Sequence, residues 1–438
     1  MNLKSFSKIL LLLLLPLFTK AQIQQNKLDS KLDSLQMALK TAPDDSVRMA
    51  TSINVAVYYL EINRDSAMYY VERSNALSKK LNQPLWTALS LSIQAYVVGW
   101  QGDISSALRL CNQALVIVNK KNSEKSAYSP KGMPFNTPQV MKLFVLSNIY
   151  HQLGNTYSNV DNDKKAIEYW KEEIKISESL KDLSTQVNSN MNIGDVYSDM
   201  GMLDSAIIYS RKALQYADIT GNKIYSGYIL NDIGNVYFKQ NRIDSAKQYY
   251  HKGLLAGKEQ QNLASEIAVN ISLAKLYKSL HQPDSVMYYA DAALQKSRIL
   301  KQARDISQSA DLLSDAWKMN GNSDSAFIYI SIAKKLGDSL SEDRNKQLTQ
   351  FQDINFEEQM RLEKEAQESI TYKNNIRTAA LIIGLALLSL LAFVFYRNNK
   401  QKQKANKVLE TTLTDLKSTQ TQLIQSEKMA SLGELTAG

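Results

Sequence analysis

The sequence predicts an all-α protein in which a solenoid of helix pairs is followed by one transmembrane helix and a coiled coil. Three observations support this fold class. Similar segments recur with a period of 40 residues, an uncharged apolar stretch of 19 residues covers 378–396, and regularly spaced leucines follow it. With 438 residues, the chain is too long for one ordinary compact domain.

The N-terminal residues 1–21 have the features of a cleavable signal peptide. Lys4 and Lys8 accompany an apolar core at 9–18, which is too short to cross a bilayer. Thr19 and Ala21 provide the small residues expected before a cleavage site. We therefore expect the following residues to be exported, and we expect a helix near 26–40 to cap the repeat array.

Seven similar segments define a repeat array over residues 22–337. Each segment has a small residue at the same place, and successive steps between these residues are 40, 59, 40, 40, 40 and 40. So regular a period predicts stacked supersecondary units. The seven small residues are Ala67, Ala107, Ala166, Ala206, Ala246, Val286 and Ala326.

Each unit is predicted to be a pair of helices. The first helix has a small residue and, three positions later, an aromatic residue. The small residue twelve positions after the first lets the second helix approach closely. Asp204, Asp244, Asp284 and Asp324 are predicted N-caps of the second helices, where a carboxylate accepts from free backbone N–H groups. The predicted packing residues are Gly154, Tyr157, Ala166, Gly194, Tyr197, Ala206, Gly234, Tyr237, Ala246, Tyr277 and Ala326.

The repeats resemble tetratricopeptide repeats. The segment "NIGDVYSDMGMLDSAIIYSRKAL" has the Leu-Gly, Tyr and two-Ala pattern of that family, with Ile193, Gly194, Tyr197, Ala206 and Ala213 at the matching positions. The resemblance covers about 50–336, although the family period is about 34 residues. It implies a solenoid whose concave surface binds a peptide or a partner protein.

The single longer step contains a 19-residue insertion at 120–138. Pro130, Pro134 and Pro138 are incompatible with a regular helix through it. The segment is either a loop that contacts a ligand or a tolerated surface insertion, and the second interpretation is favoured.

The sequence gives no catalytic, metal or cofactor site. His151, His251 and His281 lack any surrounding motif and are interpreted as packed or surface residues. Cys111 is the single cysteine, so an intrachain disulfide is excluded. The net charge of +9 includes no long basic block, and nucleic acid is not an expected partner.

Residues 338–377 contain no Gly or Pro and many charges, which predicts a helical stalk. The apolar stretch 378–396 follows, and at ~1.5 Å per residue it spans about 28 Å, close to the hydrocarbon thickness of a bilayer. Arg397 and four lysines come directly afterwards, so the C-terminal side is expected in the cytoplasm.

A coiled coil is predicted within residues 397–425, which begin with the basic collar. Leu409, Leu413, Leu416 and Leu423 lie on one heptad seam, and Gln420 is a polar seam residue. A single amphipathic helix on the membrane surface is the alternative interpretation.

The final segment "SEKMASLGELTAG", 426–438, resembles the start of the dimerisation and phosphoacceptor domain of sensor histidine kinases. The resemblance places the phosphoacceptor histidine three residues beyond Gly438, outside this chain. It implies that Met429, Leu432 and Leu435 pack the helical bundle of a homodimer. It also implies ATP and Mg²⁺ only for the kinase domain that this chain lacks, and a downstream response regulator as partner. The matching residues include Ser426, Glu427, Met429, Leu432, Gly433, Leu435 and Gly438.

The combined expectation is the sensor and transmembrane part of a two-component histidine kinase, inactive as an enzyme by itself. It would span a bacterial inner membrane once, with exported repeats and a cytoplasmic C-terminus. Two alternatives remain: control of a cytoplasmic helix-turn-helix transcription regulator, and a membrane-tethered scaffold without enzymatic output.

Overall fold

The computed structural model describes residues 32–60, 63–125, 127–128 and 137–436, and throughout these residues the regular structure is helical. The chain divides into two compact units, Met1–Phe356 and Glu357–Gly438. The predicted signal peptide, 1–21, lies outside the described residues. Residues 32–40 are helical, as expected for the helix that precedes the repeats.

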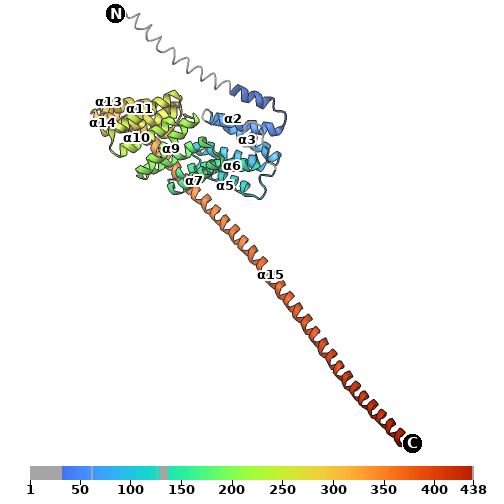
Figure 1. Cartoon of the computed structure of the whole chain (residues 1–438). Helices are drawn as coiled ribbons and strands as arrows, with labels where there is room; N and C mark the ends of the chain where they lie inside the picture. The colour runs from blue at the N-terminus through green and yellow to red at the C-terminus, as the bar shows by residue number, and fades with distance from the viewer. Residues whose placement is uncertain (1–31, 61–62, 126, 129–136, 437–438) are drawn as a thin grey trace, which may run out of the picture. The chain divides into compact units, whose positions relative to one another are not determined.

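The first unit is a solenoid of helix pairs, which Figure 1 shows as neighbouring antiparallel hairpins. The all-α fold and the repeat architecture predicted from the sequence are thereby confirmed. The seventh pair consists of α14 and the beginning of α15. The helices are α2 (Asp45–Tyr59), α3 (Arg64–Lys80), α4 (Pro84–Trp100), α5 (Ile104–Asn119), α6 (Pro138–Ser158), α7 (Asp163–Leu180), α8 (Leu183–Asp199), α9 (Leu203–Thr220), α10 (Ser226–Lys239), α11 (Ile243–Glu259), α12 (Leu263–Ser279), α13 (Pro283–Ile299), α14 (Ala303–Met319) and α15 (Ser323–Thr436).

Small residues permit the two helices of each pair to touch. All seven of the small residues that define the repeat are at most 2% exposed. The glycine of the first helix packs against the residue that lies 16 positions later, on the second helix. A Cβ built on Gly234 would lie 2.6 Å from Cδ1 of Tyr250. Gly154 meets Trp170 in the same way. A side chain at either glycine would force these helices apart.

Pairs of tyrosines join the two helices of four consecutive repeats. Tyr237 and Tyr249 are stacked with ring centroids 5.2 Å apart. The aromatic residue predicted for the first helix is therefore a packing residue, and its partner twelve positions later completes the contact. The other pairs are Tyr157–Tyr169 at 5.4 Å, Tyr197–Tyr209 at 5.5 Å and Tyr277–Tyr289 at 5.4 Å.

The predicted N-caps are wrong. The second helices begin earlier than expected, so that Asp204, Asp244 and Asp284 lie inside the first turn. Asp324 likewise lies in the first turn of α15. There the carboxylates face the positive end of the helix dipole instead of capping it. The residues at the true N-cap positions are Met202, Arg242 and Gln282, while Asn322 accepts from the Ser325 N–H at 2.9 Å.

One of the three histidines takes part in a buried polar network. His151 Nδ1 lies 3.0 Å from Oε2 of Glu173, which is 2% exposed and also accepts from the Ser189 hydroxyl at 2.7 Å. Burial lowers the pKa of His151, but the charge and hydrogen bond of Glu173 outweigh this and give a net rise. His151 is therefore a packed residue that connects α6, α7 and α8. His251 and His281 are exposed.

The described part of the insertion packs on the array. The Trp86 indole donates to the Tyr128 carbonyl at 2.9 Å, and the Tyr128 N–H donates to Gln83 Oε1 at 2.8 Å. Both partners lie at the start of α4, so this end of the insertion covers the N-terminus of that helix. Residues 129–136 of the insertion lie outside the described residues.

The second unit consists of helical residues of α15 from 357 onward. This helix contains a candidate membrane span with a mean hydropathy of 2.6, and none of that span is buried in the protein. Leu381 is 69% exposed and Phe395 is 77% exposed. The seam leucines of the predicted coiled coil are also exposed, at 54–64%. Residues 426–436 continue the helix, and Gly438 lies outside the described residues.

The close approach at Gly234 predicts a large effect of a small substitution. Gly234→Ala places a methyl group against the Tyr250 ring and should lower the free energy of unfolding by about 1–3 kcal/mol. The measurement is thermal unfolding of the full chain in detergent micelles, followed by circular dichroism.

Gly337→Ala is the matched control for this prediction. A Cβ at Gly337 has ordinary van der Waals room, 3.8 Å from Ser307 Oγ. This substitution should be neutral or stabilising by up to about 1 kcal/mol, because alanine favours the helix. Equal unfolding midpoints for Gly234→Ala and the native chain would refute the proposed helix packing.

Candidate binding surface of the repeat array

The first helices of successive pairs form the inner face of the solenoid. Direct helix contacts join α4 to α6, α8 to α10, α10 to α12 and α12 to α14. Within the described residues, contacts between consecutive second helices are marginal at most. The side on which neighbouring helices lie closer together is the concave side of a curved stack. The concave surface expected from the sequence is therefore formed by these first helices.

A polar residue follows the packing glycine or alanine of the first helix in four consecutive repeats. These residues are Asn155, Asp195, Asn235 and Lys275, which recur every 40 positions. The two asparagines serve the packing, because each accepts a hydrogen bond from the aromatic side chain of the second helix. Trp170 Nε1 donates to Asn155 Oδ1 at 3.2 Å, and the Tyr250 hydroxyl donates to Asn235 Oδ1 at 2.8 Å.

The intervening repeats have no such aromatic donor. The residue 16 positions after Gly194 is Ser210, and the residue 16 positions after Ala274 is Ala290. Asp195 and Lys275 are consequently not needed by the packing of their own helix pair. The repeats thus alternate between an uncharged packing position and a charged position on the inner face.

Asp195 on α8 and Asp232 on α10 form an acidic region of this face. Asp195 is exposed on α8, and loss of hydration, followed by repulsion from Asp199, raises the pKa of its carboxyl group to about 6. Asp232 is 8% exposed. Burial, followed by repulsion from Asp195, raises the pKa of Asp232 well above its ordinary value.

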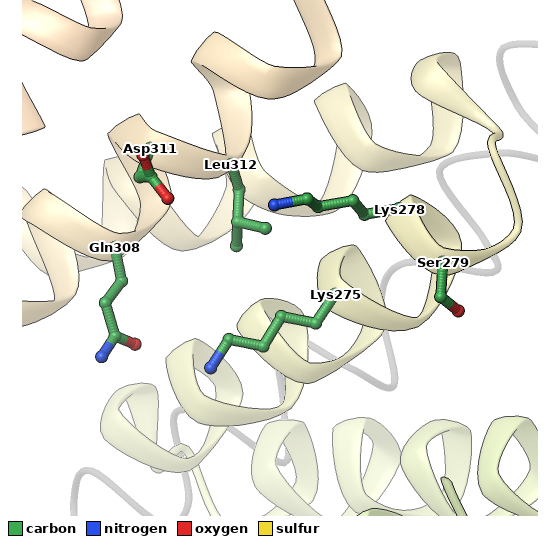
Figure 2. A pocket seen from close by; sticks show the side chains of 6 residues that line it. All are labelled: Lys275, Lys278, Ser279, Gln308, Asp311 and Leu312. Carbon is green, nitrogen blue, oxygen red and sulfur yellow. The ribbon is translucent and has the colours of Figure 1, made fainter. Parts of the chain in front are cut away.

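A region of mixed charge lies on the next two first helices, where Lys275 and Arg304 stand beside Asp305 and Asp311. Lys275 is exposed, and partial loss of hydration, followed by the charge of Arg304, lowers the pKa of its amino group. Lys275 also borders a pocket of about 510 Å³ between α12 and α14. In Figure 2, Lys275 and Lys278 extend from α12 towards Gln308, Asp311 and Leu312 of α14. Lys278 is paired with Asp315, so Lys275 is the lysine of this pocket without an ion pair among the described residues.

Within the first unit, α15 returns to the array at the second and third helix pairs. Phe351 is 5% exposed and Ile354 is 8% exposed, and both belong to the core cluster of the N-terminal repeats. The Phe351 ring meets the ring of Tyr157 edge-on, with centroids 5.3 Å apart. These contacts make residues up to Phe356 part of the first compact unit.

Polar contacts fix the register of this docked part of α15. The Tyr157 hydroxyl donates to Asn355 Oδ1 at 3.0 Å, and Arg344 forms an ion pair with Asp161. The Ser105 hydroxyl lies 3.1 Å from Gln347 Oε1. We define residues 344–355 as the docking segment of α15. The predicted stalk, 338–377, therefore begins with residues that contact the array.

The charged inner face and the docking segment were not predicted from the sequence. Applying the 40-residue period to polar residues would have aligned Asp195 with Lys275. Phe351 and Ile354 lie within the predicted stalk, and the structure packs both of them against the array. No group of three metal-ligating side chains converges anywhere in the described residues.

Comparison with family models identifies tetratricopeptide repeats. Models described as "Tetratricopeptide repeat" match residues 147–179, 187–219 and 227–258. These matches coincide with the helix pairs α6–α7, α8–α9 and α10–α11, which are therefore tetratricopeptide repeats. The search of curated proteins finds no match.

Several solved structures share the helical solenoid. The apo form of RapI has 14% identity and a TM-score of 0.48, with coverage of 67% of this chain and 99% of that chain. Aspartyl phosphate phosphatase F from Bacillus subtilis has 13% identity, a TM-score of 0.47 and coverage of 69% and 73%. NprR in complex with its cognate peptide NprX has 15% identity, a TM-score of 0.46 and coverage of 81% and 98%. At these values the similarity carries no argument about function.

The acidic region predicts a pH dependence of stability. Because the folded state raises the pKa of both Asp195 and Asp232, it binds their protons more tightly than the unfolded chain does. This stabilisation is complete below the ordinary pKa of 3.8 and is lost as the pH rises through the folded-state values, about 6 for Asp195. The other charged groups facing this region are Asp163, Asp199, Lys239 and Arg304.

The double substitution Asp195→Asn and Asp232→Asn should remove this dependence. The unfolding midpoint of the variant relative to the native chain should rise between pH 4 and pH 7, by on the order of a few °C. Asp218→Asn, an exposed residue on α9, is the control. Parallel pH profiles for the double variant and the native chain would contradict the assignment.

Proposed function

We propose that this chain is the sensor and transmembrane part of a two-component histidine kinase. The exported repeat array binds a peptide or protein on its inner face. Helix α15 relays the binding event across a bacterial inner membrane to a cytoplasmic dimeric kinase core. ATP, Mg²⁺ and a response regulator are partners of that core.

The observation that carries the proposal is the composition of α15. The same helix packs Phe351 and Ile354 into the core of the array and later supplies the exposed apolar stretch 378–396. A helix that is apolar all round and unburied is suited to a lipid environment. Because backbone hydrogen bonds make a helix stiff, a change at the docking segment has a continuous element along which to act.

The inner face supports binding as the role of the array. Its charged residues are arranged by the packing pattern of the repeats, and the pocket beside Lys275 provides a concavity of about 510 Å³. Perturbed titratable groups gathered on a concave surface are typical of functional sites. Stacked helix pairs offer an extended surface of this kind to peptides and proteins.

In this proposal, the docking segment of α15 is the element that changes between a docked and an undocked state. Its contacts are few: one aromatic pair, two apolar side chains and several polar interactions at the surface. Such a contact is weak enough to be released by a ligand that binds the undocked array more tightly. A differential affinity of about 5.5 kcal/mol moves a two-state population from 1:99 to 99:1.

The kinase assignment rests on the resemblance at 426–438. The helical residues 426–436 continue from the exposed leucine seam, so a second copy of the chain could pair with this face. In a dimer of this type, the relative position of the two helices would control access to the phosphoacceptor histidine.

The export and orientation of the chain can be tested by cysteine labelling in intact bacteria. Single cysteines replace exposed lysines on either side of the apolar stretch, in Lys258→Cys on α11 and Lys417→Cys on α15. A membrane-impermeant maleimide should label the first in spheroplasts and the second only after membrane permeabilisation.

The native chain is the control for background labelling. Its single Cys111 is fully buried, and burial raises the pKa of the thiol, so it should react slowly. Labelling of Lys417→Cys in sealed spheroplasts, or protection of Lys258→Cys, would contradict the proposed topology.

A further inference from the structure

We propose that Arg397, Lys400, Lys404 and Lys407 of α15 form a binding site for the headgroup phosphates of anionic membrane lipids. We call these four residues the basic stripe. The proposal rests on the membrane-spanning role of α15 in the proposed function and adds a lipid chemistry to it. The ligand is a phospholipid whose headgroup has a net negative charge.

The basic stripe directly follows the apolar stretch of α15. That stretch ends at Tyr396, and the Lys400 Nζ atom lies 5.8 Å from the centre of the Tyr396 ring. At ~1.5 Å per residue, Lys400 and Lys404 follow Tyr396 by about 6 Å and about 12 Å along the helix axis. Helical Cα–Cβ bonds tilt towards the N-terminus, so these long side chains lean back towards the apolar stretch. With that stretch in hydrocarbon, their ammonium groups reach the headgroup layer.

The four cations share one face of the helix. The steps between them are 3, 4 and 3 residues, and all four side chains are exposed. At about 100° per residue they fall within an arc of about 80°. Residues three or four apart lie about 5–6 Å from each other at Cβ, so two neighbouring side chains of the stripe can bind one phosphate.

No carboxylate neutralises the basic stripe. Residues 397–409 contain no Asp or Glu, and none of the four cations forms an ion pair within the described residues. The same helix does pair a cation where acids are near, because Arg361 forms ion pairs with both Glu358 and Glu365. The stripe is therefore a concentration of uncompensated positive charge, complementary to an anionic lipid surface.

The stripe and the leucine seam lie on opposite faces of α15. Leu409, Leu413, Leu416 and Leu423 centre about 160° away from the four cations around the helix axis. A helix lying flat on the membrane with its leucines inserted would turn the stripe towards water. A helix that rises from the membrane keeps the stripe beside the headgroups and leaves the seam for a second copy. Only this second arrangement uses both faces at once.

The test uses the full chain in detergent micelles, supplied with equal amounts of phosphatidylglycerol and phosphatidylcholine that have identical acyl chains. Native mass spectrometry counts the lipids of each kind that stay bound. The compared proteins are the native chain, Lys404→Gln, Lys402→Gln and the triple variant Lys400→Gln, Lys404→Gln and Lys407→Gln.

Lys402→Gln is the matched control for Lys404→Gln. Both lysines are exposed, lie two residues apart and lose the same charge. Lys404 has stripe cations four residues before it and three residues after it. Lys402 has no cation three or four residues away and lies on the seam side.

The native chain should retain phosphatidylglycerol in preference to phosphatidylcholine. Lys404→Gln should lower this preference about fivefold, the change expected for one lysine at an anionic surface, and the triple variant should abolish it. Lys402→Gln should stay within about twofold of the native chain.

A separate measurement distinguishes failure of the stripe from failure of the proposed function. Bacterial membranes that contain the native chain are washed with alkaline carbonate, which removes proteins that do not span the bilayer. A chain that resists the wash but shows no preference for phosphatidylglycerol, or equal losses in Lys404→Gln and Lys402→Gln, would refute the stripe alone. A chain that the wash removes would refute both the stripe and the membrane-spanning role of α15.

Discussion

The closest contact in each helix pair governs the architecture of this protein. A residue no larger than alanine or valine recurs every 40 positions, apart from one insertion, and is at most 2% exposed at each occurrence. Only a small side chain there allows the two helices to approach closely enough for the tyrosine pairs to meet. The same constraint shapes the inner face. In some repeats a large aromatic residue of the second helix packs over the glycine of the first helix, as Tyr250 does over Gly234. The asparagine after that glycine, here Asn235, then accepts the hydrogen bond that the aromatic side chain donates. Where Ser210 or Ala290 replaces the aromatic residue, no such donor is present, and a charged residue, Asp195 or Lys275, occupies the position of the asparagine.

The sequence predicted the helix pairs, the small residues and the apolar stretch because each depends on a local pattern that repeats. The N-caps were misplaced because Asp-Ser is a general helix-start signal, and only the backbone reveals that Met202 and Arg242 occupy the cap positions. The charged face was missed for a different reason. The charged positions of Asp195 and Lys275 can be recognised only when the residue on the second helix that packs against the preceding Gly194 or Ala274 is known. Phe351 was assigned to a stalk because its contact with Tyr157 joins residues 194 positions apart, beyond the reach of any periodic pattern.

In the proposed function, binding and relay would occupy different parts of the array. The charged region and the pocket lie on α8 to α14, whereas the docking segment of α15 contacts residues of α5 and α6 and the turn that follows. In the proposed function, a ligand on the later repeats changes their mutual packing, and the tightly packed stack passes this change to the earlier repeats. Because each repeat contacts mainly its neighbours, small rotations accumulate along a solenoid. The buried network of His151, Glu173 and Ser189 joins α6 to α8 and connects the two regions.

The most direct test of this account measures autophosphorylation of the chain extended through the codons that follow Gly438. Phe351→Ala removes the buried ring of the docking segment, and Phe356→Ala removes a ring that is 63% exposed on the same helix. If docking of α15 controls the kinase, Phe351→Ala should change the basal rate several-fold, while Phe356→Ala should leave it at the native value. Equal rates for all three proteins, or the absence of a kinase core in the extended chain, would contradict the proposed relay.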